Sequence, residues 1–567
     1  MYMLEKIVET KSCTQCSCQF DITDKDLEFY EIISPVFNWK KYKIPSPNEC
    51  SNCREQNRLA WRNERNLYHR KCDITWENII SIYSPDKPYP VYELDEWKSD
   101  RYDPFEYWRN YDFSKTFFEQ LWELINETPK QSLFRSSSCV DSPYINYCSW
   151  MNKCHLIFDS MESEDCIYGT KVSYCKNCLD CDYTIKSELC YSCNDCSNCY
   201  GLKYSSYSND CRESEFLNDC IWCMNCFMCK WLRNKSYHIF NKEYSKEEYQ
   251  EEVGKIKAKS IQELEEIFEK FCLDIPSRSC FINNSEDSSW NNLNNCSSAQ
   301  HCFDAFDIQD CKYCSRIFWS KDCYDYESWW HNTSKIYNCI WTGSHSSEVL
   351  FSVCTMSKTL RVMYSILSTG CSDCFGCVNM KDNQYCILNK QYTKEEYEEL
   401  VPKIIEKMID DWEWWAFFPS NLSLFWYNET DAQKYFPLSK EEVSKKWYNW
   451  SDYEAPFPKV EKTIQAKDLP ADITHIPDDI LNWAIICEVS WKPFKLVPQE
   501  LEFYRKHNIS IPKRHPDQRH LDRTELRNPR SLFNWNCDKC WVDIKSVYSE
   551  DRKEMVYCQS CYNKEKY

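Results

Sequence analysis

The stretch CYSCNDCSNCYGLKYSSYSNDC, residues 190–211, contains five cysteines, and four of them form an unbroken C-x2-C-x2-C-x2-C run. Such a run can belong to a metal cage, an iron–sulfur site or a disulfide framework, or its thiols can simply pack in a core. Internal repeats help to decide among these interpretations, because residues that recur at a fixed period usually have a structural role.

The cysteines around this run recur at a fixed period. Cys166, Cys181, Cys196, Cys211 and Cys226 are fifteen residues apart, and all sixteen cysteines between residues 139 and 229 fall into four columns of that period, three residues apart. A short period with small residues in fixed columns is typical of a solenoid. We therefore predict a mainly β fold, with 15-residue coils whose narrow interior is filled by free cysteines that act as small hydrophobic residues.

Thiol packing is favoured over the chemical alternatives for this run. A metal site needs all its ligands, yet serine, threonine and glycine replace cysteine within the columns. A ferredoxin-type run has a different last spacing and a following proline, whereas Tyr200 follows Cys199. The N-terminal residues MYMLEKIVETKSC lack the apolar region of a secretory signal and indicate a reducing cytoplasm, which disfavours disulfides. Bound metal and disulfides remain open as alternatives.

The repeat block is present twice. A shift of 148 residues aligns Cys166 with Cys314 and residues 237–253 with residues 385–401. In the second copy nine of eleven cysteines keep the columns, whereas Cys339 and Cys354 do not. Each copy is followed by a helix with a capping box, which we expect to cover the open end of its solenoid. The boxes pair Ser245 with Glu248 and Thr393 with Glu396.

Paired C-x2-C knuckles at both chain ends predict two zinc ribbons. Four thiolates in two knuckles match a closed, tetrahedral structural zinc site, so we expect two Zn²⁺ ions per chain. Cys18 lies beside the first knuckle as a spare thiol. The predicted metal ligands are Cys13, Cys16, Cys50 and Cys53 at one end, and Cys537, Cys540, Cys558 and Cys561 at the other.

Each chain end also contains a second ribbon that has lost most of its ligands. A shift of 465 residues aligns Cys72 with Cys537, but Thr75, Glu93 and Glu96 take the positions of the other three cysteines. Residues 487–504 resemble residues 13–30, and there Ser490, His515 and Gln518 take the positions of cysteines. His515 and His520 could rebuild a site with Cys487, although thiolates alone form the other predicted sites.

The same shift superposes two arginine ladders. Spacings of four, four and three residues place the guanidinium groups on one face of a helix. Arginines with nearby aromatic residues are suited to phosphate contact and base stacking, so these segments are candidates for nucleic-acid binding. The alternative is that the ladders pair with acidic residues of the chain itself. The ladders comprise Arg54, Arg58, Arg62 and Arg65, and Arg519, Arg523, Arg527 and Arg530.

Composition argues against nucleotide chemistry and membrane insertion. The 567-residue chain has six scattered glycines, too few for the clustered glycines of a P-loop or a dinucleotide-binding turn. No run of about 18 apolar residues occurs, so no transmembrane helix is expected. The ten histidines are dispersed and no catalytic constellation is visible, so we expect no enzymatic activity. The net charge of −19 disfavours general nucleic-acid affinity.

Several segments resemble a set of cysteine-rich, zinc-ribbon-bearing bacterial proteins. The similar segments are RLAWRNERNLYHRKCD (58–73), IISIYSPDKPYPVY (79–92), NKEYSKEEY (241–249), WYNETDAQKYFPLSKEE (426–442), WSDYEAPFPKVEK (450–462) and RHPDQRHLDR (514–523). The resemblance implies metal-binding ribbons but no particular activity. Some of these proteins carry a CaiB/BaiF-type CoA-transferase label. This chain has neither the catalytic aspartate context nor the glycine-rich CoA site that the label would require.

The predicted organisation has six parts in chain order. They are a double ribbon over 1–100, a helical linker over 101–138, a solenoid with its capping helix over 139–275, a second over 280–412, an aromatic connector over 413–480 and a double ribbon over 481–567. We expect a cytoplasmic, non-enzymatic scaffold that binds nucleic acid, most simply RNA, through the arginine helices. The alternatives are a protein-binding scaffold that uses the solenoid faces, and a metal or redox buffer that uses the solenoid thiols.

Overall fold

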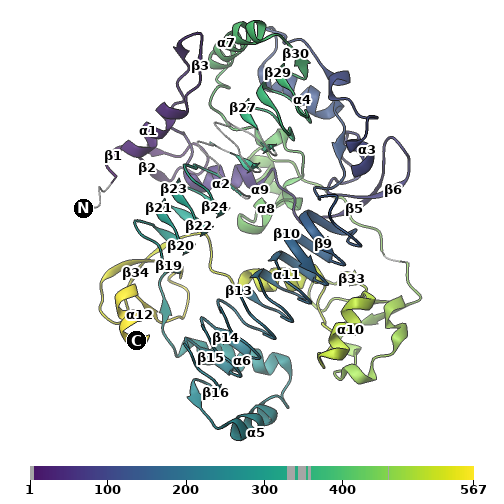
Figure 1. Ribbon diagram of the computed structural model, residues 1–567, viewed down its shortest axis with the longest axis vertical. Coiled ribbons are helices and arrows are strands. Elements are labelled where there is room, and N and C mark those ends of the chain that lie inside the picture. Colours follow the sequence, from purple (N-terminus) through teal and green to yellow (C-terminus); the bar gives the residue numbers. More distant parts are fainter. Residues whose placement is uncertain are drawn as a thin grey trace. The chain divides into compact units, whose positions relative to one another are not determined.

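The computed structural model describes residues 5–327, 337, 339–342, 353–355, 359–457 and 459–566. The chain forms two compact units, and each unit combines two separate segments. Met1–Ser132 joins Cys280–Tyr453 in the first unit, and Leu133–Ser279 joins Glu454–Tyr567 in the second. Each unit therefore holds one solenoid and one terminal ribbon module (Figure 1).

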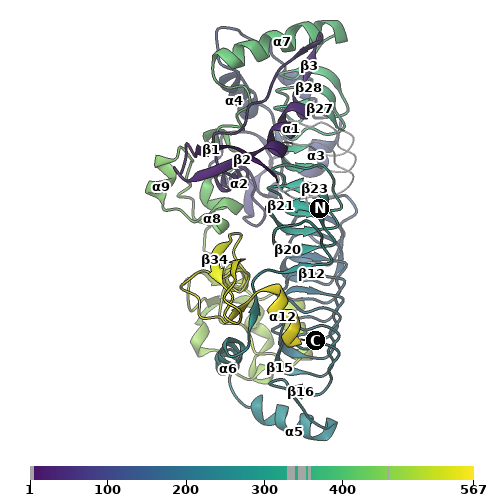
Figure 2. The same ribbon diagram turned by 90° about the vertical axis from the view of Figure 1, so that its left-hand side faces the viewer.

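Both cysteine-rich blocks are β-solenoids, but most of their coils contain twelve residues rather than the predicted fifteen. Thr170 pairs in parallel with Asp182, and Asp182 pairs with Asn194 in the next coil. The 15-residue period was wrong because cysteines that recur at multiples of three residues fit both lengths. The backbone hydrogen bonds between coils decide the length, and Figure 2 shows the resulting stack of coils in each solenoid.

Each coil has a corner at every third residue. Asp165, Tyr168 and Lys171 all have left-handed backbone, and the series continues through the first solenoid. Twelve residues divided by three give four corners per coil. The residue after each corner points inward, and the interior is so narrow that a Cβ atom on Gly169 would overlap the carbonyl oxygen of Cys181. Most inner positions therefore hold cysteine, serine, threonine or glycine, and others hold aliphatic residues such as Val172, Leu202 and Leu217.

The inward cysteines are buried free thiols. Among the cysteines that the structure describes as free are all sixteen between residues 139 and 229. The sulfur of Cys196 lies 3.2 Å from the carbonyl oxygen of Asn194 and 3.5 Å from that of Ser205. Ser163 uses the same pair of relative positions, with its hydroxyl 3.2 Å and 2.9 Å from two carbonyl oxygens. Cys175 lies one coil after Ser163 in the same column, and its sulfur is 3.3 Å from the carbonyl oxygens of both Ser173 and Thr184. Cysteine and serine therefore make the same contacts within one column, as the packing interpretation expected.

The first solenoid lies between Ile145 and Ile239. Its strands are β9 (Ile145–Asn152), β10 (His155–Glu164), β11 (Ile167–Ser173), β12 (Asp182–Ile185), β13 (Asn194–Ser197), β14 (Glu215–Asn218), β15 (Phe227–Lys230) and β16 (His238–Ile239). The last coil is closed by an antiparallel pair of β16 with β17 (Lys242–Glu243). The predicted capping box of Ser245 and Glu248 starts α5 (Lys246–Ile256). The following helix, α6 (Ile261–Leu273), packs Leu264 against Phe216 and Phe227 of the solenoid.

The second solenoid contains three longer coils. Glu327 pairs with Ile340, Ile340 with Val353, and Val353 with Ile366, so each of these coils has thirteen residues. Each of these coils has one residue more than twelve, so together they shift the inward positions by three residues, which equals the spacing between corners. This shift explains why Cys339 leaves the predicted columns and is still buried. The side chain of Cys354 lies outside the described part of the chain.

The strands of the second solenoid are β19 (Ile282–Asn283), β20 (Trp290–Asn294), β21 (Ser297–Gln300), β22 (Cys302–Phe306), β23 (Gln309–Lys312), β24 (Ser315–Phe318), β25 (Ile340–Thr342), β26 (Val353–Thr355), β27 (Leu360–Met363), β28 (Ser372–Phe375) and β29 (Gln384–Ile387). An antiparallel pair with β30 (Lys390–Gln391) ends this solenoid too. The predicted capping box of Thr393 and Glu396 starts α7 (Lys394–Asp410), whose buried face includes Tyr397 and Val401.

The terminal modules supply short hairpins and helices. In the first unit these are β1 (Ile7–Ser12), β2 (Gln19–Thr23), α1 (Asp24–Ile33), β3 (Val36–Phe37), β4 (Lys40–Lys41), α2 (Ser51–Leu59), β5 (Tyr68–Lys71), β6 (Asn78–Ser81), β7 (Val91–Tyr92), α3 (Leu94–Lys98), α4 (Phe117–Glu127), β8 (Lys130–Gln131), α8 (Asp431–Tyr435) and α9 (Lys440–Lys445). In the second unit they are β18 (Ser277–Arg278), β31 (Lys462–Gln465), β32 (Trp483–Ile486), β33 (Pro493–Phe494), α10 (Pro498–Lys506), α11 (Pro516–Glu525), β34 (Phe533–Asn536), β35 (Asp543–Ser546), β36 (Val556–Tyr557) and α12 (Gln559–Lys566).

Candidate metal centres and arginine contacts

Four cysteines of the C-terminal ribbon converge on one point. The sulfur atoms of Cys537, Cys540, Cys558 and Cys561 all lie within 4.8 Å of one another. The first knuckle follows β34, and the second lies between β36 and α12. Burial raises the pKa of Cys537, but backbone N–H groups, first that of Cys558, outweigh burial and lower the pKa to about 6. This cluster contains the four predicted ligands.

The sulfur positions fit a tetrahedral ion. A Zn–S bond of about 2.3 Å places neighbouring ligand sulfurs about 3.8 Å apart in a tetrahedron. The sulfurs of Cys540 and Cys558 are 3.7 Å apart. In the N-terminal ribbon the sulfurs of Cys16 and Cys50 are also 3.7 Å apart. Two groups of four cysteines could therefore each hold a metal ion.

The N-terminal cluster differs in composition from the predicted ligand set. The four sulfurs within 4.8 Å of one another belong to Cys13, Cys16, Cys18 and Cys50, so Cys18 takes the place expected for Cys53. Cys53 remains buried beside Cys13 and Cys50, and its hydrogen bond to Cys50 lowers the pKa of Cys50 to about 4. The sulfurs of Cys16 and Cys18 are only 3.2 Å apart, shorter than the edge of a zinc tetrahedron. Five thiols thus compete for four ligand positions.

The second ribbon of the N-terminal module keeps the knuckle geometry without the ligands. The backbone N–H of Glu93 donates to the sulfur of Cys72 at 3.3 Å. The corresponding N–H of Cys558 donates to the sulfur of Cys537 at 3.2 Å in the intact ribbon. In the described part of the chain, no group of three metal-binding side chains forms around Cys72 or Cys487. This ribbon therefore keeps the backbone hydrogen bond to its first cysteine although three of the four ligand positions hold other residues.

The two histidines near Cys487 make hydrogen bonds with other residues. The ring of His520 lies 3.1 Å from a carboxylate oxygen of Asp182. His515 is the N-cap of α11 and accepts a hydrogen bond from the backbone of Asp517. Among the described residues, His515 and His520 do not form a metal site with Cys487.

The arginine ladders lie only partly on helices. α2 ends at Leu59 and α11 ends at Glu525, so two arginines of each ladder lie on a helix and two lie beyond it. The helical pairs are Arg54 with Arg58, and Arg519 with Arg523. The prediction of four guanidinium groups on one helix face is wrong for both ladders, because each helix ends at its second turn.

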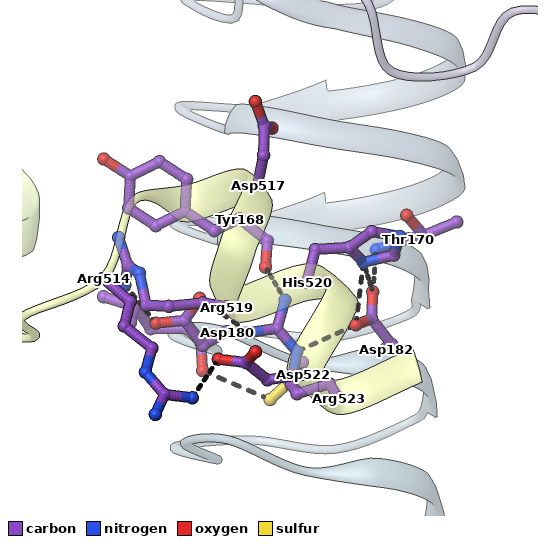
Figure 3. Close-up of polar contacts among 12 residues, drawn as sticks. Tyr168, Thr170, Asp180, Asp182, Arg514, Asp517, Arg519, His520, Asp522 and Arg523 are labelled. Carbon is purple, nitrogen blue, oxygen red and sulfur yellow. Dashed lines mark hydrogen bonds and ion pairs between the residues drawn. The ribbon is translucent and has the colours of Figure 1, made fainter. Parts of the chain in front are cut away.

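In the second unit, α11 packs its arginines against one corner of the solenoid (Figure 3). Arg519 pairs with Asp180 and, at 3.2 Å, with Glu500 of α10. Arg523 bonds Asp180 at 2.9 Å and Asp182 at 2.8 Å. The guanidinium group of Arg519 also lies over the ring of a solenoid tyrosine, Tyr168, 4.6 Å from its centroid.

The carboxyl groups of this cluster are held in a dry environment. Glu500 is fully buried, and burial raises its pKa although Arg519 opposes the shift. The hydroxyl of Tyr168 donates to Glu500 at 2.8 Å. Burial without these partners would be strongly unfavourable for ionised groups. The helix and the solenoid are therefore complementary in charge at a fully desolvated contact.

The first unit repeats the same contact. Arg54 bonds Asp325 through two nitrogens, at 2.7 and 3.0 Å, and lies over the ring of Tyr313. Arg58 lies 3.5 Å from Asp325 and 3.9 Å from Glu327. Tyr313 and Asp325 are twelve residues apart, as Tyr168 and Asp180 are, so both pairs occupy one corner of adjacent coils. The two units thus use an equivalent docking contact, which we call the arginine–corner contact.

Sequence reasoning missed the acidic half of this contact. The signal was a tyrosine followed after twelve residues by an aspartate and two residues later by a second acid, in both blocks. It identifies Tyr168, Asp180 and Asp182 in one block and Tyr313, Asp325 and Glu327 in the other. Only the 12-residue coil length makes the spacing meaningful, because it places the tyrosine and the first aspartate at one corner.

Most of the ladder arginines are buried in this arrangement. Arg58 and Arg62 are each 1% exposed, and Arg523 is 4% exposed. Arg527 bonds Asp195 at 2.7 Å, whereas Arg65 and Arg530 are half-buried. Six of the eight ladder arginines therefore pair with acids of the chain itself. Nucleic-acid binding through the ladders stays a prediction.

No protein-family model matches this chain, and no curated protein matches it. The resemblance to cysteine-rich ribbon proteins therefore stays an expectation. In the part of the chain that the structure describes, no helix is both long enough and apolar enough to cross a membrane.

Proposed function

We propose that this protein is a non-enzymatic, zinc-stabilised scaffold that binds other proteins through the faces of its solenoids. The observation that carries the proposal is the arginine–corner contact, which occurs in both units. In this contact the arginines, which would otherwise favour nucleic-acid binding, hold each ribbon module against a solenoid. The ribbons act as braces, and the solenoid faces away from them remain available for partners.

We propose zinc as the metal of both clusters, with two ions per chain. Tetrathiolate sites with closed coordination are typical of structural zinc, and such sites stabilise the fold rather than activate water. The abundance of free thiols among the described cysteines supports a reducing compartment, and we propose the cytoplasm. The net charge of −19 supports protein partners over nucleic acid.

The test uses the full-length protein purified with its metal. Elemental analysis is expected to give close to two zinc ions per chain. Titration with single-stranded RNA at low salt is expected to give no binding. Affinity capture from a nuclease-treated lysate, followed by titration of each purified candidate partner, is expected to give a protein complex that persists without RNA.

Two outcomes would overturn this proposal. RNA binding that weakens steeply with salt would indicate phosphate contacts and return the nucleic-acid interpretation to first place. Zinc content of six or more per chain would mean that solenoid thiols bind metal, as a metal buffer requires.

A further inference from the structure

Tryptophan occupies most of the left-handed backbone positions outside the solenoids. Beyond residues 133–243 and 280–391, which form the solenoids and their closing hairpins, the described residues include ten with left-handed backbone, and seven of these are tryptophan. None of the ten is glycine. They are Ser17, Asn38, Trp39, Trp76, Trp412, Trp415, Trp447, Trp491, Asn508 and Trp541. A bulky residue in this region is an outlier, because its Cβ atom crowds the backbone.

One of these tryptophans lies in a tight hairpin turn. Phe37 pairs with Lys40, so Asn38 and Trp39 form a two-residue loop between β3 and β4. Their φ angles are 47° and 65°. A two-residue turn with both central residues left-handed is type I′, for which the favoured sequence is Asn-Gly. Trp39 therefore stands where the turn geometry favours glycine.

Two more tryptophans follow helices. α7 and α9 both end in a Schellman motif, in which the residue after the C-cap is usually glycine. In α9 the N–H of Trp447 bonds the carbonyl of Ser444, and the N–H of Tyr448 bonds that of Val443. Trp412 occupies the same position after α7, and the two tryptophans have φ angles of 62° and 61°.

Three others occupy one position in three different ribbon knuckles. Trp76, Trp491 and Trp541 have φ angles of 64°, 59° and 62°. Each donates its backbone N–H to the carbonyl of the first knuckle cysteine, at 2.8, 3.2 and 2.8 Å respectively. This turn requires left-handed backbone at its last residue, and glycine adopts that conformation without steric cost. Tryptophan thus takes the position that favours glycine in three ribbon knuckles, whereas Ser17 takes that position in the first ribbon.

The side chains of these six tryptophans are exposed to solvent. Their exposures range from 71% for Trp491 to 100% for Trp39. Within the described chain, none of the six indole rings has a hydrogen bond or a ring contact recorded. By contrast, Trp61 and Trp414 have ordinary backbone angles and are 1% and 0% exposed. Trp61 and Trp414 thus differ from the six tryptophans in both backbone angle and burial.

The glycine and tryptophan contents of the chain agree with these observations. The chain has six glycines and 24 tryptophans in 567 residues, whereas glycine makes up about 7% of an average protein. Five of the six glycines lie within the solenoid blocks. The many turns and helix ends outside those blocks consequently have almost no glycine to use.

We propose that glycine occupies positions 39, 76, 412, 447, 491 and 541 in the protein that its own cell makes, because that cell reads the UGA codon as glycine. UGA is a reassigned codon, which different genetic codes read as tryptophan or as glycine. Under this assignment each of these six tryptophans becomes the residue that its turn favours. Trp415, which is left-handed and half-buried, belongs to the same group.

The first experiment is peptide mass spectrometry of the protein isolated from its native cell, together with the codons of its gene. Peptides that cover the six positions are expected to contain glycine, and their codons are expected to be UGA. Peptides that cover Trp61 and Trp414 are expected to contain tryptophan encoded by UGG. Tryptophan at the six positions in the native peptides would overturn the proposal and would instead make these indoles candidate docking anchors.

The second experiment compares two forms of the full-length protein made in a host with the standard code. A variant with glycine at all six positions is expected to have a higher midpoint of thermal unfolding than the tryptophan form, because the left-handed strain is removed. Trp61→Gly and Trp414→Gly are the matched controls, and each is expected to lower the midpoint because it leaves a large cavity. A lower midpoint for the six-position variant would contradict the proposal.

Discussion

At the scale of single residues, the solenoid interior is defined by size and by one hydrogen bond. The side chain at each inward position must be narrow. It must also fit beside two backbone carbonyl oxygens, those of the residue two before it and the residue nine after it. The thiol of Cys196 and the hydroxyl of Ser163 meet both requirements in the same way. Buried thiols act here as small packing groups with a weak donor.

This equivalence predicts the outcome of substitution at Cys196. Cys196→Ser is expected to lower the free energy of unfolding by about 1–3 kcal/mol, since the hydroxyl keeps the donor but loses apolar volume. Cys196→Leu is expected to cost more, because Cys196 and its column neighbours Thr184 and Ser208 are fully buried and a larger side chain would overpack the coil. Urea denaturation of both variants measures the difference. Equal losses would mean that packing is not the reason for the cysteine.

The five thiols of the N-terminal ribbon lead to a second prediction at this scale. The short distance between Cys16 and Cys18 argues that these two sulfurs do not bind one zinc ion together. We expect Cys18→Ser to keep two zinc ions per chain and Cys53→Ser to reduce the number to one. Elemental analysis of the two purified variants distinguishes the ligands. The reverse result would make Cys18 the fourth ligand and Cys53 the spare thiol.

At the scale of elements, the arginine–corner contact holds a helix against a solenoid by buried charge. The guanidinium groups of α2 and α11 are at most 8% exposed and lie against carboxylates that are themselves buried. Such pairs contribute little net stability relative to apolar packing, but removing one partner leaves an uncompensated buried charge. The contact therefore specifies where the ribbon module docks.

The cost of breaking this contact can be measured at Arg523. Arg523→Gln leaves Asp182 and Asp180 with fewer partners in a buried position, and we expect a loss of about 3–5 kcal/mol in the free energy of unfolding. Arg505→Gln is the matched control, because Arg505 is exposed on α10 and pairs with exposed Asp478. That control is expected to change stability by about 0–1 kcal/mol. Equal small effects for both variants would show that the buried pair is not structurally important.

At the scale of the whole molecule, each compact unit joins segments that are far apart in the chain. The N-terminal ribbon module shares a unit with the second solenoid, and the C-terminal module shares one with the first. Within each unit the candidate metal cluster lies in the ribbon module, while the solenoid core consists of free thiols and aliphatic side chains. The candidate metal cluster and the solenoid thiols therefore lie in different parts of the same unit.

This separation predicts the effect of metal removal. A chelator is expected to release two zinc ions and to unfold the ribbon knuckles, because four thiolates without an ion repel one another. The solenoids are expected to keep their strand signal, since their backbone pairing involves no metal. Far-ultraviolet circular dichroism and hydrogen exchange before and after chelation measure both changes. Loss of the solenoid signal on chelation would contradict this assignment of roles.

Much of the local structure was predictable from sequence. The inward cysteines, the capping boxes at Ser245 and Thr393, the four C-terminal ligands and the start of α2 after Cys50 all depend on residues close together in the chain. Such features follow from spacing and from short-range hydrogen bonds. The left-handed turns at the knuckles also follow from local backbone bonds.

The coil length and the partners of the arginines depended on the tertiary structure. A column of inward cysteines fits any multiple of three residues, so only the pairing of Thr170 with Asp182 establishes twelve. The ladder at Arg519 and Arg523 has the same charge pattern whether it faces solvent or Asp180. The reason is physical: the spacing of side chains along a chain is local, whereas backbone pairing between coils and the burial of a charge depend on segments that meet only after folding.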